Sequence, residues 1–277
     1  MRKQGLVIIM ILGALIFSNS VSSRTFTIAI EPNYPNQQLE QMIKPLSDWL
    51  KSQTGHDLKL VPAENYYLYW KDTVLEQPDL TLDSPHITSY RIQERNYKPL
   101  VRTAEATYYH LVVDYDLHQS DPYLVENMPG KRIATLQHPS MASILYEKWY
   151  GGSAIMPAKI LARYSFQDGI DLIFDAEADA TIIPEKMLAL YPNFVSVKKS
   201  EAVLGLTLSV APHINDNTAL AIQQALLNAK DDSNAYEALV EWNTSHFVEA
   251  QEAEYVDLVS LIPRSYMDSA REAFAAK

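Results

Sequence analysis

Residues able to hold a small molecule recur in the loops that follow the predicted strands of this chain. Tyrosine is frequent, at 17 of 277 residues, and several tyrosines stand at or beside strand ends. Hydroxyl groups donate or accept hydrogen bonds, and tyrosine rings can form the walls of a pocket. On this basis we predict ligand contacts by Tyr34, Tyr66, Tyr67, Ser84, Tyr108, Tyr109 and Glu185.

Each of these residues also has a purely structural interpretation. Tyrosines often fill the edge of a core with the hydroxyl in water. In the adjacent pairs, Tyr66–Tyr67 and Tyr108–Tyr109, one ring should face away if the segment is extended. Ser84 could simply cap the helix that follows it. Glu185 could meet an ammonium group of a ligand, or it could be a solvated carboxylate at a helix start.

The sequence shows no pattern typical of an active site, a metal site or a nucleotide site. His110 and His118 do not stand at a metal-ligand spacing with carboxylates. No serine lies in a Gly-x-Ser-x-Gly turn, and no Gly-rich phosphate loop occurs among the 8 glycines. The absence of cysteine excludes thiol chemistry. We therefore expect no catalytic residue, no metal and no cofactor.

The elements that must position the candidates alternate between strands and helices. Phe26–Ile30 has the composition of a strand, and apolar residues at three- and four-residue spacing predict a helix from Leu39 to Leu50. Pro45 interrupts that pattern, and Gly55 is a plausible stop for the helix. The β-α order up to about Arg95 predicts a mainly parallel sheet covered by helices.

A second β-α series begins at Lys131 and predicts a second lobe. We expect residues 24–115 and 207–277 to form the first lobe, and residues 116–206 to form the second. Long strands near Val112–Tyr115 and Leu206–Val210 are expected to cross between the lobes as a two-strand hinge. Ligands of open parallel sheets lie beyond the carboxyl ends of the strands, so the predicted site is the cleft between the lobes.

The first 23 residues resemble a secretory signal peptide. Arg2 and Lys3 precede an apolar run, Leu6–Phe17, and a small polar stretch, Ser18–Ser23. Cleavage is expected at the end of that stretch, with Ser20 as the alternative position. A retained membrane anchor is the other interpretation, but a spanning helix needs about 20 apolar residues and this run is shorter.

Composition narrows the compartment and the partners. Without cysteine the chain has neither a lipid-attachment residue nor a disulfide, which favours the periplasm of a Gram-negative cell. The formal charge of −11 disfavours nucleic acid and anionic membranes as partners. It does not exclude an anionic ligand, because backbone N–H groups can bind anions inside a pocket. We expect a monomer.

Several stretches, in their order along the chain, resemble the phosphate/phosphonate-type solute-binding proteins of ABC importers. The likeness covers nearly all of the chain after the signal peptide. The stretches that carry it are Lys44–Leu50 with Thr54 and Gly55, Pro78–Pro85, Tyr97–Val101, Tyr108–Val113, Pro129–Ala134, Ala176–Ala180, and Phe247–Ala250 with Glu254 and Tyr255.

The resemblance implies an α/β protein with the two-lobed type II periplasmic binding fold. It also implies a small solute, expected to be anionic and phosphonate- or phosphate-like, that is captured in the cleft for a permease in the inner membrane. The family usually opens the first helix of its second lobe with a Ser-Thr-Ser-Gly run, whose hydroxyls and N–H groups hold the phosphonate. Here that stretch is His138–Ser143, where Ser140 or Ser143 keeps a hydroxyl and Met141 and Ala142 supply none. The ligand therefore stays open.

Two other functions fit the same fold. The protein could present its ligand to a membrane receptor kinase in trans and so serve as a sensory module. An exported enzyme is the least favoured hypothesis, because no nucleophile and base stand in a recognisable arrangement.

Overall fold

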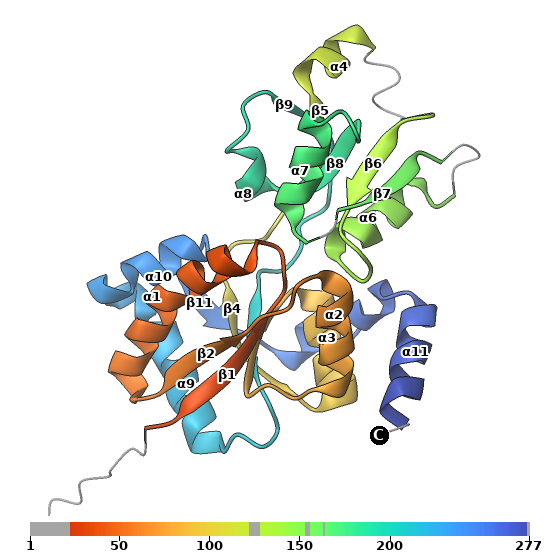
Figure 1. Cartoon of the computed structure of the whole chain (residues 1–277). Helices are drawn as coiled ribbons and strands as arrows, with labels where there is room; N and C mark the ends of the chain where they lie inside the picture. The colour runs from red at the N-terminus through yellow and green to blue at the C-terminus, as the bar shows by residue number, and fades with distance from the viewer. Residues whose placement is uncertain (1–22, 122–127, 153–155, 163, 276–277) are drawn as a thin grey trace, which may run out of the picture.

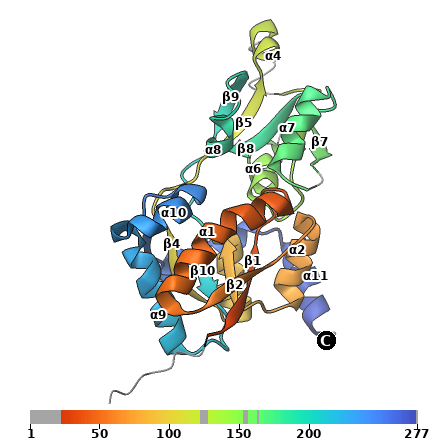
Figure 2. The same ribbon diagram turned by 60° about the vertical axis from the view of Figure 1, so that its left-hand side comes forward.

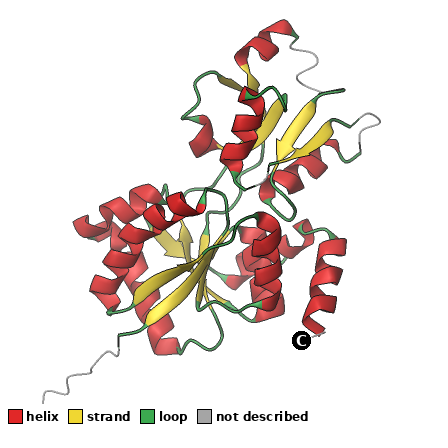
Figure 3. Cartoon of the chain, viewed as in Figure 1, coloured by secondary structure: helices red, strands yellow, loops and turns green. Residues whose placement is uncertain are grey.

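The computed structural model describes residues 23–121, 128–152, 156–162 and 164–275. These residues form two lobes, each built on one sheet with helices beside it (Figures 1 and 3). No helix within the described ranges is both long and apolar enough to cross a bilayer. The predicted signal peptide lies, except for Ser23, outside the described residues.

The sheet of the first lobe has the order β11-β4-β10-β3-β1-β2 among the described strands. β1 is parallel to β2 and β3, whereas β10 is antiparallel to β3 and β4, and β11 is antiparallel to β4. The strands are β1 (Thr25–Ile30), β2 (Asp57–Val61), β3 (Leu80–Asp83), β4 (Lys98–Thr103), β10 (Thr207–Val210) and β11 (Phe247–Glu249).

The second lobe has a sheet of order β7-β6-β8-β5-β9 within its described part. β6 is parallel to β7 and β8, while β5 is antiparallel to β8 and β9. The strands are β5 (Tyr109–Asp114), β6 (Arg132–Thr135), β7 (Ala158–Leu161), β8 (Ala180–Pro184) and β9 (Phe194–Lys199). The two-lobed α/β prediction is confirmed, but both sheets are mixed rather than mainly parallel. The reason is that β5 and β10 follow a crossing between the lobes and enter their sheets in the reverse direction.

Helices flank both sheets (Figure 3). Those of the first lobe are α1 (Asn36–Thr54), α2 (Tyr66–Leu75), α3 (Pro85–Arg95), α9 (Asp216–Asn228), α10 (Tyr236–Glu241) and α11 (Arg264–Ala275). Those of the second are α4 (Tyr115–Ser120), α6 (Met141–Tyr150), α7 (Phe166–Phe174) and α8 (Glu185–Leu188). Short 3₁₀ turns join the C-terminal elements: η1 (Ala229–Asp231), η2 (Ser233–Ala235), η3 (Glu252–Glu254) and η4 (Leu258–Leu261).

The amphipathic pattern of the first predicted helix is confirmed in α1. The apolar residues predicted from spacing are buried against the first sheet, with Leu46 at 1% and Leu50 at 0% exposure. Pro45 lies within the helix, and Gly55 ends it at a φ of 75°, where an L side chain is strained. This helix covers the sheet beside β1, so it fixes the loop at the carboxyl end of β1.

The crossing between the lobes is formed by residues 104–108 and 200–206. Thr107 and Val203 exchange backbone hydrogen bonds of 2.8 and 2.9 Å, which ties the two segments together. Gly205 approaches Thr103 so closely that a Cβ would lie 2.4 Å from the Thr103 carbonyl oxygen. The predicted hinge near Val112–Tyr115 and Leu206–Val210 is wrong, because β5 and β10 occupy those stretches inside the two sheets.

The lobe boundary at residue 115 is corrected for the same reason. β5 pairs with β8 and β9, so it belongs to the second sheet although it was assigned to the first lobe. The run from Ala106 to Asp114 has the composition of one long strand, and only strand pairing shows that its first residues lie in the crossing.

The lobes are packed against each other beyond the crossing. One apolar cluster extends from Tyr66 and Tyr69 of α2 to Tyr109 and Met141 of the second lobe. Viewed from two angles, α8 lies above α10, which brings the second lobe over the C-terminal part of the first (Figures 1 and 2). A site between the lobes therefore has walls from both.

Candidate functional site

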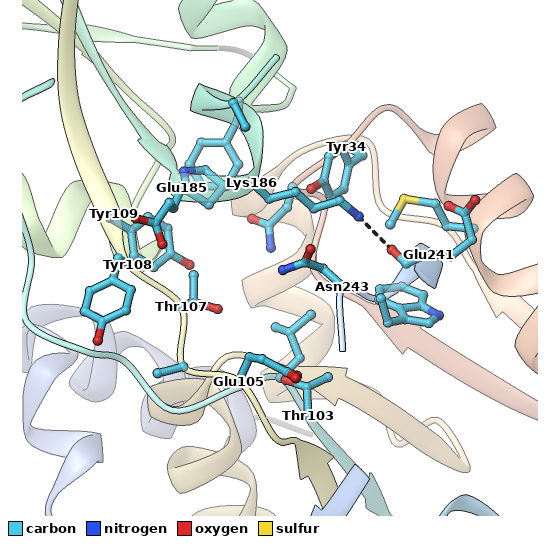
Figure 4. Close-up of a pocket in the computed structure, with 18 residues that line it drawn as sticks. Tyr34, Thr103, Glu105, Thr107, Tyr108, Tyr109, Glu185, Lys186, Glu241 and Asn243 are labelled. Atoms are coloured by element: carbon cyan, nitrogen blue, oxygen red, sulfur yellow. Dashed lines mark hydrogen bonds between the residues drawn. The ribbon is translucent and has the colours of Figure 1, made fainter. Parts of the chain in front are cut away.

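A cavity of about 350 Å³, partly open to solvent, lies between the lobes, and Figure 4 shows the residues that line it. Its walls come mainly from the loop after β1, residues 103–109 in and beside the crossing, α8 with the residue before it, and the end of α10. Met42 of α1, Phe166 of α7 and Leu206 also line it. The volume is within the range that small-molecule pockets occupy. The cavity is thus at the place predicted from strand ends and lobe order.

Aromatic rings form much of its wall. Tyr34 comes from the loop after β1, Tyr108 and Tyr109 come from the crossing and the start of β5, and Phe166 and Trp242 complete the set. Pro32 and Pro35 stop β1 from continuing, which turns the chain and presents Tyr34 to the cavity. Such rings can contact an apolar ligand group or the face of a cation.

One lysine bridges the lobes at the cavity. The Lys186 ammonium of α8 donates to the backbone carbonyl of Glu241 in α10, 3.0 Å away (Figure 4). Burial lowers the pKa of Lys186, and the Glu241 charge opposes that change. This contact joins the start of α8 in the second lobe to the end of α10 in the first, at the wall of the cavity.

Two further carboxylates of the wall are held by partners. Glu185 accepts from Lys199 at 2.8 Å, which lowers the pKa of Glu185, and the Lys199 ammonium lies 4.0 Å from the centre of the Tyr108 ring. Glu105 accepts from the Ser245 N–H at 2.9 Å, from the Ser245 hydroxyl at 2.5 Å and from the Thr244 hydroxyl at 2.6 Å. Burial alone would raise the pKa of Glu105, but these donors lower it to about 2.

The structure brings four of the predicted residues together in this wall. Tyr34, Tyr108, Tyr109 and Glu185 all line the cavity. Both tyrosines of the second pair line it, Tyr108 from the end of the crossing segment and Tyr109 from the first position of β5. Tyr109 is buried, and its pKa is raised by burial and by the charge of Glu31.

Tyr66 and Ser84 lie next to the cavity wall but bind a residue that sequence analysis did not single out, Glu31. The Tyr66 hydroxyl donates to the Glu31 carboxylate at 2.6 Å, and the Ser84 hydroxyl donates to it at 2.8 Å. Glu31 follows the last residue of β1 and is 2% exposed. A glutamate directly after a buried strand and before a proline was the signal that could have revealed it.

Tyr67 faces away from the interior, with 61% of its surface exposed. Its backbone N–H nevertheless donates to the Gln137 side chain of the second lobe at 3.0 Å. A second contact of this kind joins His86 Nε2 to the Pro139 carbonyl oxygen at 2.7 Å. Burial lowers the pKa of His86 to about 4, so the ring is neutral near pH 7 and donates this hydrogen bond.

Ser140 and Ser143 are fully buried at the start of α6 and are absent from the wall of the cavity. Ser140 caps the helix by accepting from the Ser143 N–H at 3.2 Å. The Ser143 hydroxyl accepts from the Lys159 ammonium at 2.6 Å. Their predicted ligand contacts stay predictions. In the described part of the chain, no group of His, Asp and Glu could hold a metal ion.

Comparison with solved structures identifies the fold. PhnD1 from Prochlorococcus marinus, in complex with methylphosphonate, superimposes with a TM-score of 0.74 at 13% identity, covering 86% of this chain and 96% of that one. The binding protein component of an ABC phosphonate transporter from Pseudomonas aeruginosa gives 0.69 at 12% identity, covering 91% and 88%. XAC2383 from Xanthomonas citri, bound to ATP, gives 0.64 at 14% identity, covering 90% and 98%.

The fold is that of two-lobed periplasmic binding proteins. A family model described as ABC transporter, phosphonate, periplasmic substrate-binding protein matches residues 28–255, and the chain belongs to this family. Comparison with curated proteins finds no match. Members of this family are periplasmic substrate-binding components of ABC transporters, not enzymes, and they work with ABC permeases.

Proposed function

We propose that this protein captures a small solute in the interlobe cavity and presents it to an ABC permease in the inner membrane. The observation that carries the proposal is the composition of the cavity wall, which takes residues from both lobes and from the crossing between them. A solute bound there contacts both lobes at once and favours the closed arrangement, and a permease can distinguish that arrangement from the open one.

The rest of the proposal concerns the setting of the protein. The basic start and apolar run of residues 1–23 act as a signal peptide that is removed on export. The mature chain works as a monomer, and it releases its solute unchanged. Methylphosphonate, which the Prochlorococcus protein binds, is the first solute to test, together with phosphate and small amines.

Binding can be measured by titration calorimetry and by the fluorescence of Trp242, which lies in the cavity wall. Replacing Tyr34 by alanine should weaken binding of the solute about tenfold or more, because a buried ring contact is lost. Tyr115 is a matched control, since it is 53% exposed and lies outside the cavity wall. Equal binding by wild type, Tyr34→Ala and Tyr115→Ala would place the solute elsewhere.

A further inference from the structure

Glu31 sits in a cradle of hydrogen-bond donors at the carboxyl end of β1. One carboxylate oxygen accepts from the Ser84 N–H at 2.5 Å. The other accepts from the hydroxyls of Ser84 and Tyr66, at 2.8 and 2.6 Å, and from the Asn33 amide at 3.3 Å. Each oxygen therefore faces at least one group that can only donate, which is the environment of an ionised carboxylate.

The donors of this cradle are those that hold oxyanions in proteins. Ser84 precedes the 11-residue helix α3, so its N–H points from the start of a helix toward the carboxylate. All four donors are neutral: they are the Ser84 N–H, the hydroxyls of Ser84 and Tyr66, and the Asn33 amide. A phosphonate, phosphate or carboxylate of a ligand would use the same groups, and here the chain itself supplies the anion.

The cradle adjoins the solute cavity. Asn33 donates to Glu31 and also lines the cavity wall. Tyr109 lies in the same wall, and its pKa is raised first by burial and then by the charge of Glu31. Glu31 therefore stands at the inner edge of the solute site, where an anionic group of a ligand bound in this cavity would reach the first lobe.

Groups at the start of α6, in the second lobe, are also hydrogen-bonded within the protein. The Ser143 N–H donates to the Ser140 hydroxyl oxygen, and the Ser143 hydroxyl accepts from Lys159. The Pro139 carbonyl accepts from His86 of α3. Among the described residues that line the cavity, Glu105, Glu185 and Glu241 are acidic and Lys186 is basic, and the Lys186 ammonium is already bonded to a carbonyl. Lys199, beside the wall, pairs with Glu185, so within the described chain Glu105 and Glu241 stand without a cationic partner in an ion pair. This excess of negative charge, beside aromatic rings, suits a positively charged group.

We propose that Glu31 determines specificity by taking the place of a ligand's anionic group, so that the cavity selects small solutes carrying an ammonium or guanidinium group over free oxyanions. This proposal rests on the proposed function, because it assigns a ligand class to the same cavity. It predicts that the wild-type protein is indifferent to small oxyanions and that removal of the Glu31 side chain creates a vacant oxyanion site.

Glu31→Ala is the direct test, with acetate, phosphate and methylphosphonate as probes in calorimetry and thermal melting at constant ionic strength. Acetate matches the carboxymethyl group that the variant lacks. We expect the variant to bind the probes at least about tenfold more tightly than wild type and to rise in melting temperature with them, because ligands that bind only the folded state stabilise it. Chloride at equal ionic strength is the control.

The double variant Glu31→Ala/Tyr66→Phe shows whether the anions occupy the cradle. Loss of one hydroxyl donor should weaken the gained binding about tenfold. Oxyanion binding by the wild-type protein tests the proposal without any question of whether a variant folds. If wild type binds phosphate or methylphosphonate as tightly as Glu31→Ala does, the proposal is overturned. The same conclusion follows if Glu31→Gln, which keeps the shape of the side chain, fails to alter the preference between anions and amines.

A second arm titrates wild type with ethanolamine, choline and arginine. Binding of at least one amine, weakened by Tyr34→Ala and unaffected by phosphate, is the expected result. Oxyanion binding that is sensitive to Tyr34→Ala would overturn the specificity proposal and leave solute capture intact. Absence of any Tyr34-dependent binding would instead count against the proposed function itself.

Discussion

Two buried carboxylates lie at the ends of neighbouring strands, and they are stabilised by different kinds of partner. Asp83, the last residue of β3, is 0% exposed and pairs with the Arg91 guanidinium at 2.7 Å. Glu31, one residue beyond β1, is 2% exposed and receives hydrogen bonds from neutral groups alone. The helix α3 serves both, since its N-cap residue Ser84 donates to Glu31 and its second turn carries Arg91.

The difference separates a structural charge from one placed at a binding site. Arg91 also bonds to Thr73 and packs on the ring of Tyr97, so its ion pair with Asp83 is enclosed on every side within the first lobe. Burial alone would lower the pKa of Arg91, but Asp83 raises it. Glu31 lies where the two lobes meet, and its donors are groups that could serve a different anion equally well.

The largest expected effect comes from breaking the Asp83 pair. Arg91→Met should lower the free energy of unfolding by about 3–5 kcal/mol, because it leaves a buried carboxylate without its counter-charge. Urea unfolding followed by circular dichroism measures the loss. The double variant Asp83→Asn/Arg91→Met should regain most of it, and a double variant no more stable than the single one would contradict this explanation.

Glu31→Gln should cost far less, about 1 kcal/mol, in the same unfolding experiment. The hydroxyls of Tyr66 and Ser84 can rotate and accept from an amide, whereas a guanidinium can only donate. A loss as large as that of Arg91→Met would mean that the charge of Glu31 is as essential to the fold as that of Asp83.

The pH dependence of stability provides a further distinction. Burial raises the pKa of Glu31 above its ordinary 4.5, and its hydrogen bonds limit the rise. The folded protein thus holds this proton more tightly than the unfolded chain, so the contribution is fully present below pH 4.5 and is lost as the pH rises through the folded-state pKa. We expect wild type to lose stability relative to Glu31→Gln as the pH rises from 4.5; parallel curves would contradict the prediction.

Glu105 should have the smallest effect on stability, and the pH dependence of its contribution should be opposite to that of Glu31. It also accepts from neutral donors, but it is exposed, and its pKa falls from 4.5 to about 2. Its contribution is present above pH 4.5 and is lost as the pH falls toward 2. Because solvent screens it, Glu105→Gln should change stability by less than about 1 kcal/mol at pH 7. Acid titration of the unfolding free energy, with Glu249→Gln as an exposed control, measures it.

The sequence predicts the lobes and the position of the cleft from elementary patterns. The spacing of Leu46 and Leu50 determines a helix face, and the alternation of strands and helices determines which loops meet. Tyr34, Tyr108, Tyr109 and Glu185 were found in this way. The hinge was misplaced because the pairing of β5 with β8, between residues such as Tyr109 and Pro184, is not visible in a single sequence.

The role of Glu31 was missed for a related reason. A glutamate at a strand end is ordinarily a solvated residue, and only three-dimensional convergence of Ser84, Tyr66 and Asn33 shows that it is enclosed. Likewise, the contact between the Lys159 ammonium and the Ser143 hydroxyl cannot be read from the residues near Ser143, because the two lie 16 residues apart.

The contact between Lys186 and the main chain at position 241 has a consequence for how this cavity can change. Since the acceptor is a carbonyl oxygen, any residue at 241 supplies it, and the bridge between the lobes depends on the identity of one partner alone. The side chain at 241 is then free to vary in size and charge without loss of the bridge. Such a protein can acquire new solutes at that wall while it retains the same way of closing.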